Sequence, residues 1–322
     1  MSNPTQLKYD PDVGYTFIPN LKIRVLHESG GYLLQTNDLG FRSGPVDTSD
    51  RKQILVFGDS FTAGDGVSNG KRWTDELARL IPRVDVHNFG LPGTGTDQQY
   101  LAWRKFAAHR PCDLLVVVVL VENVRRITAA YRPVEGPGGE PMFKAKPYFK
   151  LANGVLERHH DPVPVDHVAL AALAGEADQG GRFPGLRKFI RKVGLQQVMQ
   201  SLTAYQPVPD YDDPQSAGWQ LMQAILSRWA AECAAPMVIV PLPLYQHVEE
   251  TADARPYQAR FSELAATIGR PVVDPLPALR AHSVAERRAF RFARDVHLTP
   301  QGHAATANAL APAIGQLAGV IF

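Results

Sequence analysis

Cysteine is scarce in this chain, and neither sign of charge dominates. Two cysteines among 322 residues cannot form a disulfide framework, so Cys112 and Cys233 are interpreted as reduced, small apolar residues of a cytoplasmic protein. The net charge of +2 gives no general electrostatic case for a nucleic-acid partner. The sequence therefore argues against a disulfide-stapled secreted scaffold and predicts no nucleic acid as a partner.

No stretch of the sequence is long and apolar enough to predict a membrane span. The longest apolar run, from Leu114 to Val121, is too short to cross a bilayer. The first residues, MSNPTQLKYDPD, hold no apolar core, so no signal peptide is expected. We therefore expect a soluble, cytoplasmic protein without a transmembrane segment.

From about residue 53 onward, short apolar runs alternate with segments of helical spacing. Strands are expected at 53–57, 84–89, 113–121, 236–243 and 270–274. Helices are expected at 73–80, 97–108, 215–234 and 299–317. The run 113–121 is apolar throughout, as in a strand that is buried on both faces. This alternation predicts an α/β fold in which helices cover both faces of a parallel sheet.

Two regions interrupt the alternation within what we expect to be a single domain, 1–322. Residues 1–50 are interpreted as an N-terminal decoration. Residues 125–214 form an insertion after the third strand, too long for a simple connection and expected to shape the substrate site. Within it, Asn153-Gly154 lies between two strand-like segments and predicts a type I′ hairpin.

The segment GLRKFIRKVG, residues 185–194, places apolar residues on one helix face and basic residues around the rest. One interpretation is a helix that docks on the protein body and exposes a solvated basic face. The other is a patch that makes a weak contact with an anionic membrane surface or an anionic substrate carrier. The pattern favours the first interpretation and leaves the second open.

Ser60 follows directly after the first core strand, in the segment ILVFGDSFTAGDGV. In open α/β sheets, ligands bind in the crevice beyond the carboxyl ends of the strands. The small residues after Ser60 allow a tight turn and a close approach of the backbone. Serine is common in turns, but this position also suits a nucleophile.

Further polar groups follow at the ends of other predicted elements. Gly90, in NFGLPG after the second strand, is expected to present an unobstructed backbone N–H, and Asn123 follows the third strand. His297 lies just before the last helix, with Asp295 near enough to orient it. Serine, imidazole and carboxylate together make an activated nucleophile. The backbone N–H groups of Ser60 and Gly90 and the side chain of Asn123 are candidate oxyanion-hole donors.

The blocks GDSFTAG, NFGLPG, VEN and DVHLTPQGH resemble, in order and spacing, those of the SGNH hydrolase superfamily, also called the GDSL esterases. The resemblance implies a three-layer α/β/α sandwich with a five-stranded parallel sheet in flavodoxin-like order. It implies Ser60 as nucleophile, His297 as base, Asp295 as the orienting carboxylate, and Gly90 with Asn123 as oxyanion donors. It also implies hydrolysis or transfer of an acyl group, with no metal and no organic cofactor.

Two departures from the superfamily pattern are visible. Many members have aspartate three residues before the histidine, where this chain has Arg294 and the carboxylate, Asp295, comes two before. This D-x-H spacing resembles some polysaccharide O-acetyltransferase relatives of the superfamily. The third block usually reads G-x-N-D, whereas Glu122 and Val124 flank Asn123 here, so a different turn is expected.

Three functions are compatible with these residues. The first is a serine esterase or deacylase that hydrolyses an acyl ester, with acetyl favoured, of a carbohydrate or small molecule through an acyl-enzyme on Ser60. The second is an O-acyltransferase that uses the same residues, and the third is a non-catalytic binding module on the same fold. Because all three triad candidates are present, the sequence favours the enzyme.

Other motifs carry weaker signals. GDSFTAGDG lacks the Gly-Lys-Ser/Thr ending of a P-loop, and GLPGTG has the wrong glycine order for a dinucleotide site. His303 is interpreted as a structural residue of the last helix, and Asp59 as a local turn-former. A histidine-rich stretch matches no firm metal-ligand pattern; its members are His159, His160, Asp161 and His167.

Overall fold

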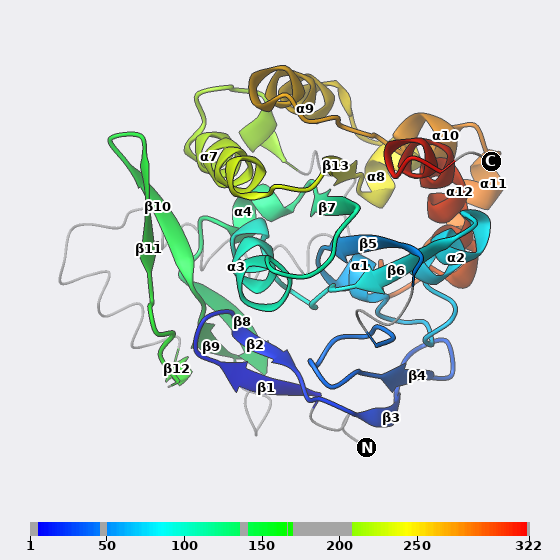
Figure 1. Cartoon of the computed structure of the whole chain (residues 1–322), viewed down its shortest axis with the longest axis horizontal. Coiled ribbons are helices and arrows are strands. Elements are labelled where there is room, and N and C mark those ends of the chain that lie inside the picture. Colours follow the sequence, from blue (N-terminus) through cyan, green and yellow to red (C-terminus); the bar gives the residue numbers. More distant parts are fainter. Residues whose placement is uncertain (1–5, 46–49, 136–140, 166, 170–207, 321–322) are drawn as a thin grey trace.

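The structure of the chain is a computed structural model that describes residues 6–45, 50–135, 141–165, 167–169 and 208–320. In these residues the central feature is a four-stranded parallel sheet with the strand order β13-β7-β5-β6 (Figure 1). Its strands are β5 (Lys52–Phe57), β6 (Val84–Asn88), β7 (Leu114–Leu120) and β13 (Met237–Leu242). The sequence predicted these strands with nearly the same boundaries.

The expectation of a fifth full strand at 270–274 is wrong. Val272 forms only an isolated parallel bridge with Ile239 of β13. The bridge is supported by hydrogen bonds from the Ile239 N–H to the Pro271 carbonyl and from the Val273 N–H to the Ile239 carbonyl. Pro271 and Pro275 flank the bridge, and proline has no N–H with which to extend a ladder. The segment therefore occupies the edge position of a flavodoxin-like order without forming a strand.

Helices cover both faces of the sheet, so the three-layer α/β/α prediction is confirmed. Phe57 and Val117 belong to one apolar cluster with α3 (Thr96–Phe106), α7 (Ala217–Glu232) and α9 (Arg255–Ile268). Val56 and Val118 belong to a second cluster with α2 (Trp73–Leu80) and α12 (Pro300–Leu317). Successive strand residues point to opposite faces, which explains why neighbours such as Val56 and Phe57 enter different clusters.

The N-terminal region forms two hairpins beside the sheet (Figure 1). The first pairs β1 (Leu7–Asp10) with β2 (Gly14–Phe17), and the second pairs β3 (Lys22–Val25) with β4 (Tyr32–Gln35). Phe17 and Leu34 are fully buried in the same cluster as α3 and α7. The region predicted to decorate the N-terminus therefore shares the main apolar core.

The insertion contributes antiparallel strands. β8 (Tyr131–Glu135), β9 (Pro141–Ala145) and β12 (His167–Ala169) form one small sheet, and β10 (Tyr148–Ala152) pairs with β11 (Val155–His159). Asn153 and Gly154 both have positive φ, 50° and 79°, as a type I′ turn requires. The predicted hairpin is thus confirmed, whereas the basic segment 185–194 lies outside the described residues.

Short helices complete the described chain. They are α1 (Ser60–Ala63), α4 (Asn123–Arg126), α8 (Tyr245–Val248), α10 (Leu276–Arg280), α11 (Val284–Ala289) and a 3₁₀ turn at Pro209–Tyr211. None of the helices in this part of the chain combines the length and the apolar character that a membrane crossing requires.

Candidate active site

Ser60 is the first residue of α1 and lies just beyond the carboxyl end of β5. Asp59 caps this helix, because its side chain accepts a hydrogen bond of 3.0 Å from the Phe61 N–H. The other carboxylate oxygen of Asp59 pairs with Arg126 Nη1 of α4 at 2.9 Å. Asp59 is therefore a local turn-former, as the sequence predicted, and it fixes the direction in which Ser60 leaves the strand.

Asp295 and His297 come together with Ser60, although they are far away in the sequence. His297 Nε2 lies 2.7 Å from Ser60 Oγ, and His297 Nδ1 lies 2.5 Å from Asp295 Oδ1. The backbone N–H of His297 also donates to Asp295 Oδ1 at 3.2 Å. The carboxylate thus folds back over its own turn, which is how a D-x-H spacing places it against the ring.

The loop between β3 and β4 adds two side chains that sequence reasoning missed. His27 Nε2 lies 3.1 Å from Asp295 Oδ2, so each carboxylate oxygen faces a different imidazole. The Glu28 carboxylate accepts hydrogen bonds from the backbone N–H groups of Arg294 and Asp295. No motif or periodicity in the sequence marks His27 or Glu28, because both act on a segment that lies near the other end of the chain.

The charges around His297 favour its protonated form. Burial disfavours a charged ring, but the hydrogen bond with Asp295 and the charge of Asp65 outweigh burial and raise the pKa of His297. Burial also disfavours the Asp295 carboxylate, but hydrogen bonds from His297 and His27 outweigh it and lower the pKa of Asp295 to about 2. Asp295 is therefore ionised at neutral pH. Its contact with Nδ1 places the ring proton there and leaves Nε2 as an acceptor toward Ser60.

Asn123 presents a buried amide without a protein partner. It is the first residue of α4 and is fully buried. Neither its amide nitrogen nor its amide oxygen has a hydrogen-bond partner among the described residues. A buried polar group without a hydrogen-bond partner lowers the stability of the fold by about 1–3 kcal/mol. The amide of Asn123 is therefore available to form a hydrogen bond with a ligand.

Gly90 differs from the expectation. Its N–H is not unobstructed, because it donates to Asn88 Oδ1 at 2.9 Å. A Cβ at this position would lie 2.3 Å from the backbone nitrogen of Ala63 in α1, so only glycine fits here. Asn88 in turn donates from Nδ2 to the Thr62 carbonyl at 2.6 Å. The end of β6 therefore braces α1, and the N–H of Gly90 is already engaged in this brace.

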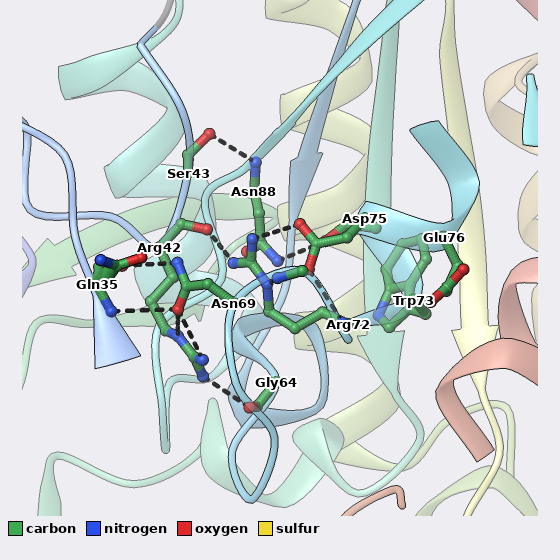
Figure 2. Close-up of polar contacts among 12 residues, drawn as sticks. Gln35, Arg42, Ser43, Gly64, Asn69, Arg72, Trp73, Asp75, Glu76 and Asn88 are labelled. Atoms are coloured by element: carbon green, nitrogen blue, oxygen red, sulfur yellow. Dashed lines mark hydrogen bonds and ion pairs between the residues drawn. The ribbon is translucent and has the colours of Figure 1, made fainter. Parts of the chain in front are cut away.

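A buried polar cluster supports the other end of α1 (Figure 2). Arg42, which is fully buried, donates from Nη1 to the Gly64 carbonyl at 2.6 Å and from Nη2 to Asn69 Oδ1 at 2.9 Å. Arg72 donates to the Arg42 carbonyl and forms an ion pair of 2.6 Å with Asp75. The N-terminal region thus contacts the C-terminal end of α1, the helix that carries Ser60, through Arg42. It also contacts Asp295 through His27.

The contacts of His303 indicate a structural role, as the sequence predicted. It is buried in α12, and its Nδ1 accepts a hydrogen bond of 3.1 Å from the Trp73 N–H. Burial, together with the charges of Arg72 and Arg42, lowers the pKa of His303 to about 3. The His303 ring stays neutral, and its Nδ1 already accepts a hydrogen bond from the backbone of α2. It is therefore not placed to act as a base at Ser60.

The cysteines and the histidine-rich stretch were the remaining candidates for reactive or metal-binding side chains. Cys112 and Cys233 are both free, and burial raises the pKa of each, that of Cys112 to about 12. In the part of the chain that the structure describes, no group of three or more histidine, cysteine and acidic side chains is arranged to hold a metal ion.

An apolar cavity adjoins the Ser60–His297 pair. Phe61, which follows Ser60, lines it and lies with its ring centroid 4.7 Å from that of His297. Val296 and Leu298, which flank His297, line it as well, together with Tyr245 and Phe290. Most of the side chains that line this cavity are apolar, and three of them are sequence neighbours of Ser60 or His297.

The model of the GDSL-like Lipase/Acylhydrolase family matches residues 56–305. A search of curated proteins finds no match. Among solved structures, a member of the lipolytic protein G-D-S-L family from Veillonella parvula is similar at 14% identity, with 81% of this chain and 97% of that chain covered and a TM-score of 0.42.

Two further solved structures are similar at the same low level. The lipase/acylhydrolase from Enterococcus faecalis has 13% identity, with 82% of this chain and 96% of that chain covered and a TM-score of 0.43. The acetylxylan esterase Axe2 from Geobacillus stearothermophilus has 13% identity, with 85% of this chain and 96% of that chain covered and a TM-score of 0.44.

Proposed function

The chain belongs to the GDSL-like lipase/acylhydrolase family, and from this membership we propose that it is a serine esterase that works through an acyl-enzyme on Ser60. The observation that carries the proposal is the continuous contact from Ser60 Oγ to His297 Nε2, at 2.7 Å, and from His297 Nδ1 to Asp295, at 2.5 Å. This is the arrangement that a base needs in order to activate a hydroxyl. The proposed substrate is an acyl ester, with acetyl favoured, of a carbohydrate or small molecule.

The reaction proceeds in two halves. Ser60 Oγ forms a bond to the ester carbonyl carbon while His297 Nε2 accepts the hydroxyl proton, and His297 then gives this proton to the departing alkoxide. Water next attacks the acyl-enzyme, His297 accepts a proton from the water, and the acyl group leaves as a carboxylic acid while Ser60 regains its proton. Asp295 stays ionised throughout and stabilises the imidazolium that forms in each half.

The negative oxygen of the tetrahedral intermediate needs hydrogen-bond donors. We assign Nδ2 of Asn123 and the N–H of Ser60 to this role, since the amide is buried without a partner and the first N–H groups of a helix have no acceptor within it. The N–H of Gly90 already donates to Asn88 Oδ1. It can also donate to the negative oxygen only through a three-centre hydrogen bond that both acceptors share.

Replacing Asn123 with alanine is expected to lower kcat by on the order of 10²–10³, the usual cost of one oxyanion donor. KM is expected to change little, because this hydrogen bond strengthens mainly in the transition state. Steady-state kinetics on a p-nitrophenyl ester measure both constants. An Asn123→Asp variant, which keeps the shape but replaces the donor with an acceptor, is expected to be at least as impaired; unimpaired kcat in both variants contradicts the assignment.

The experiment that tests the function is a measurement of product partitioning. The protein is incubated with p-nitrophenyl esters of increasing acyl length and with acetylated sugars, with and without free sugar acceptors, and Ser60→Ala is the control. We expect free carboxylic acid to form at the rate at which the ester is consumed. If free acid forms slowly while acceptors speed consumption and become acylated, the protein is an acyltransferase. If no ester is consumed, the binding-module alternative stands.

A further inference from the structure

We propose that His27 is a positioning residue that fixes Asp295 and thereby sets the orientation and the ionisation of His297. The inference rests on the proposed function, because it concerns the same nucleophile, base and carboxylate. It adds a fourth side chain to that series, and this side chain comes from the N-terminal region. Ser60, His297, Asp295 and His27 are connected in this order by distances of 2.7, 2.5 and 3.1 Å.

The contacts of His27 determine which of its nitrogens carries the proton. The backbone N–H of Ser29 donates to His27 Nδ1 at 3.2 Å, and the Ser29 hydroxyl oxygen lies 2.9 Å from the same nitrogen. A nitrogen that accepts a hydrogen bond has no proton of its own, so the neutral ring carries its proton on Nε2. That nitrogen faces Asp295 Oδ2. His27 therefore donates a hydrogen bond to the carboxylate, and its tautomer is fixed by the loop on which it lies.

Packing holds this ring in place. The His27 side chain is only 10% exposed, and its ring meets the edge of Phe292 with a centroid distance of 4.6 Å. A Cβ on Gly66 would lie 2.7 Å from the Phe292 ring and 3.1 Å from His27 Cε1. Because Gly66 has a φ of 88°, glycine suits this position in two ways. The loop after α1 thus leaves room for the two rings.

The two histidines hold opposite ends of one carboxylate. His297 binds Oδ1 through both its ring and its backbone N–H, and His27 binds Oδ2. A carboxylate held at both oxygens has one orientation. Without His27, the backbone N–H of His297 still keeps Oδ1 at the ring, but the plane of the carboxylate is free to tilt. Glu28 holds the backbone of the same segment through the N–H of Asp295. One loop therefore positions both the main chain and the side chain of the orienting residue.

The hydrogen bond from His27 also affects the proton affinity of His297. It withdraws electron density from Asp295 and is one of the contacts that lower the pKa of that carboxyl. Without it, Asp295 becomes a stronger acceptor toward His297 and stabilises the imidazolium more. Among the described residues, the other titratable groups near the pair include Glu28, Asp65, Asp59 and Tyr32, whose ring centroid lies 6.0 Å from that of His27. A substitution at His27 leaves these four groups in the protein, so a change in the titration of His297 is attributed to the loss of His27.

Two variants of His27 test the inference. His27→Leu keeps apolar contact with Phe292 and removes the donor, whereas His27→Gln keeps a donor at about the position of Nε2. In His27→Leu we expect kcat to fall by roughly 10- to 100-fold, the size of effect that slight misplacement of a catalytic group produces. KM is expected to stay within about twofold, because His27 does not contact the reacting atoms in this account. His27→Gln is expected to recover most of kcat.

An NMR titration of the His297 ring provides a readout that does not depend on turnover. We expect the midpoint of His297 to move to higher pH in His27→Leu and to return toward the wild-type value in His27→Gln. If both variants titrate like the wild type, or if the glutamine variant is no better than leucine in kcat and midpoint, the positioning role is overturned. Failure of the proposed function looks different, since the wild-type protein itself then consumes no ester and Ser60→Ala changes nothing.

Discussion

Ser60→Ala is expected to abolish ester turnover, with kcat lowered by on the order of 10⁶, as when the nucleophile of a serine hydrolase is removed. The reason is that the side chain contributes the atom that bonds to the acyl carbon, and no other hydroxyl of the described residues is hydrogen-bonded to His297 Nε2. The fold is expected to survive, because the substitution removes one hydrogen bond, worth about 1 kcal/mol. Steady-state kinetics and urea unfolding measure the two effects separately.

The matched control for this variant is Ser68→Ala. Ser68 lies in the loop after α1, and its Oγ accepts a hydrogen bond of 2.9 Å from the Leu33 N–H. This variant also loses one hydroxyl and one hydrogen bond close to the site. We expect its activity to stay near that of the wild type. Equal losses in both variants indicate damage to the local structure, and full activity in Ser60→Ala removes the assignment of the nucleophile.

His297→Ala is expected to lose activity to a similar degree, because the two residues act as one unit. In the wild type, only the neutral ring accepts the Ser60 proton. Activity therefore rises with pH as His297 loses its proton. Since the pKa of His297 is raised above its usual 6.5, this rise is expected at a higher pH than an unperturbed histidine gives. The measurement is the pH profile of kcat/KM.

The control for the second prediction is His303→Asn. The amide oxygen of asparagine replaces Nδ1 as the acceptor for the Trp73 N–H, so the variant tests the imidazole of His303 without leaving a buried donor unpaired. We expect the activity and the acid limb of the wild type to remain. If the acid limb disappears in His303→Asn and persists in His297→Ala, His303 is the base and the assignment to His297 is wrong.

The sequence predicted the parts of the fold that local pattern determines. The apolar run at 113–121 matches β7, and the helical spacing at 73–80 matches α2. A segment such as 270–274 is harder to predict. Whether it forms a strand depends on its pairing with β13, and the two segments pair only at Val272 and Ile239. Pro271 and Pro275 show in the sequence that the ladder is interrupted, but the sequence alone does not show how much of it remains.

The sequence also predicted only part of the candidate site. Ser60, Asn123, Asp295 and His297 were singled out because each lies next to a predicted strand or helix in a recognisable block. Ser60, His297 and Asp295 lie within hydrogen-bond distance of one another in series, and their catalytic roles stay a prediction. The contacts of His27 and Glu28 could not be predicted from the sequence. No pattern in the sequence around the β3–β4 loop indicates that this loop contacts residues 294–295. The engagement of the Gly90 N–H by Asn88 Oδ1 depends on a side-chain rotamer that spacing does not specify.

The most direct test of the central claim is to identify the covalently modified residue. The protein is treated with a fluorophosphonate, and separately with a p-nitrophenyl ester quenched within one turnover, and the adduct is located by peptide mass spectrometry. We expect one adduct, on Ser60, which forms faster as His297 loses its proton and does not form in Ser60→Ala. An adduct on another residue while Ser60 stays unmodified, or ester hydrolysis that proceeds at the wild-type rate in Ser60→Ala, contradicts the central claim.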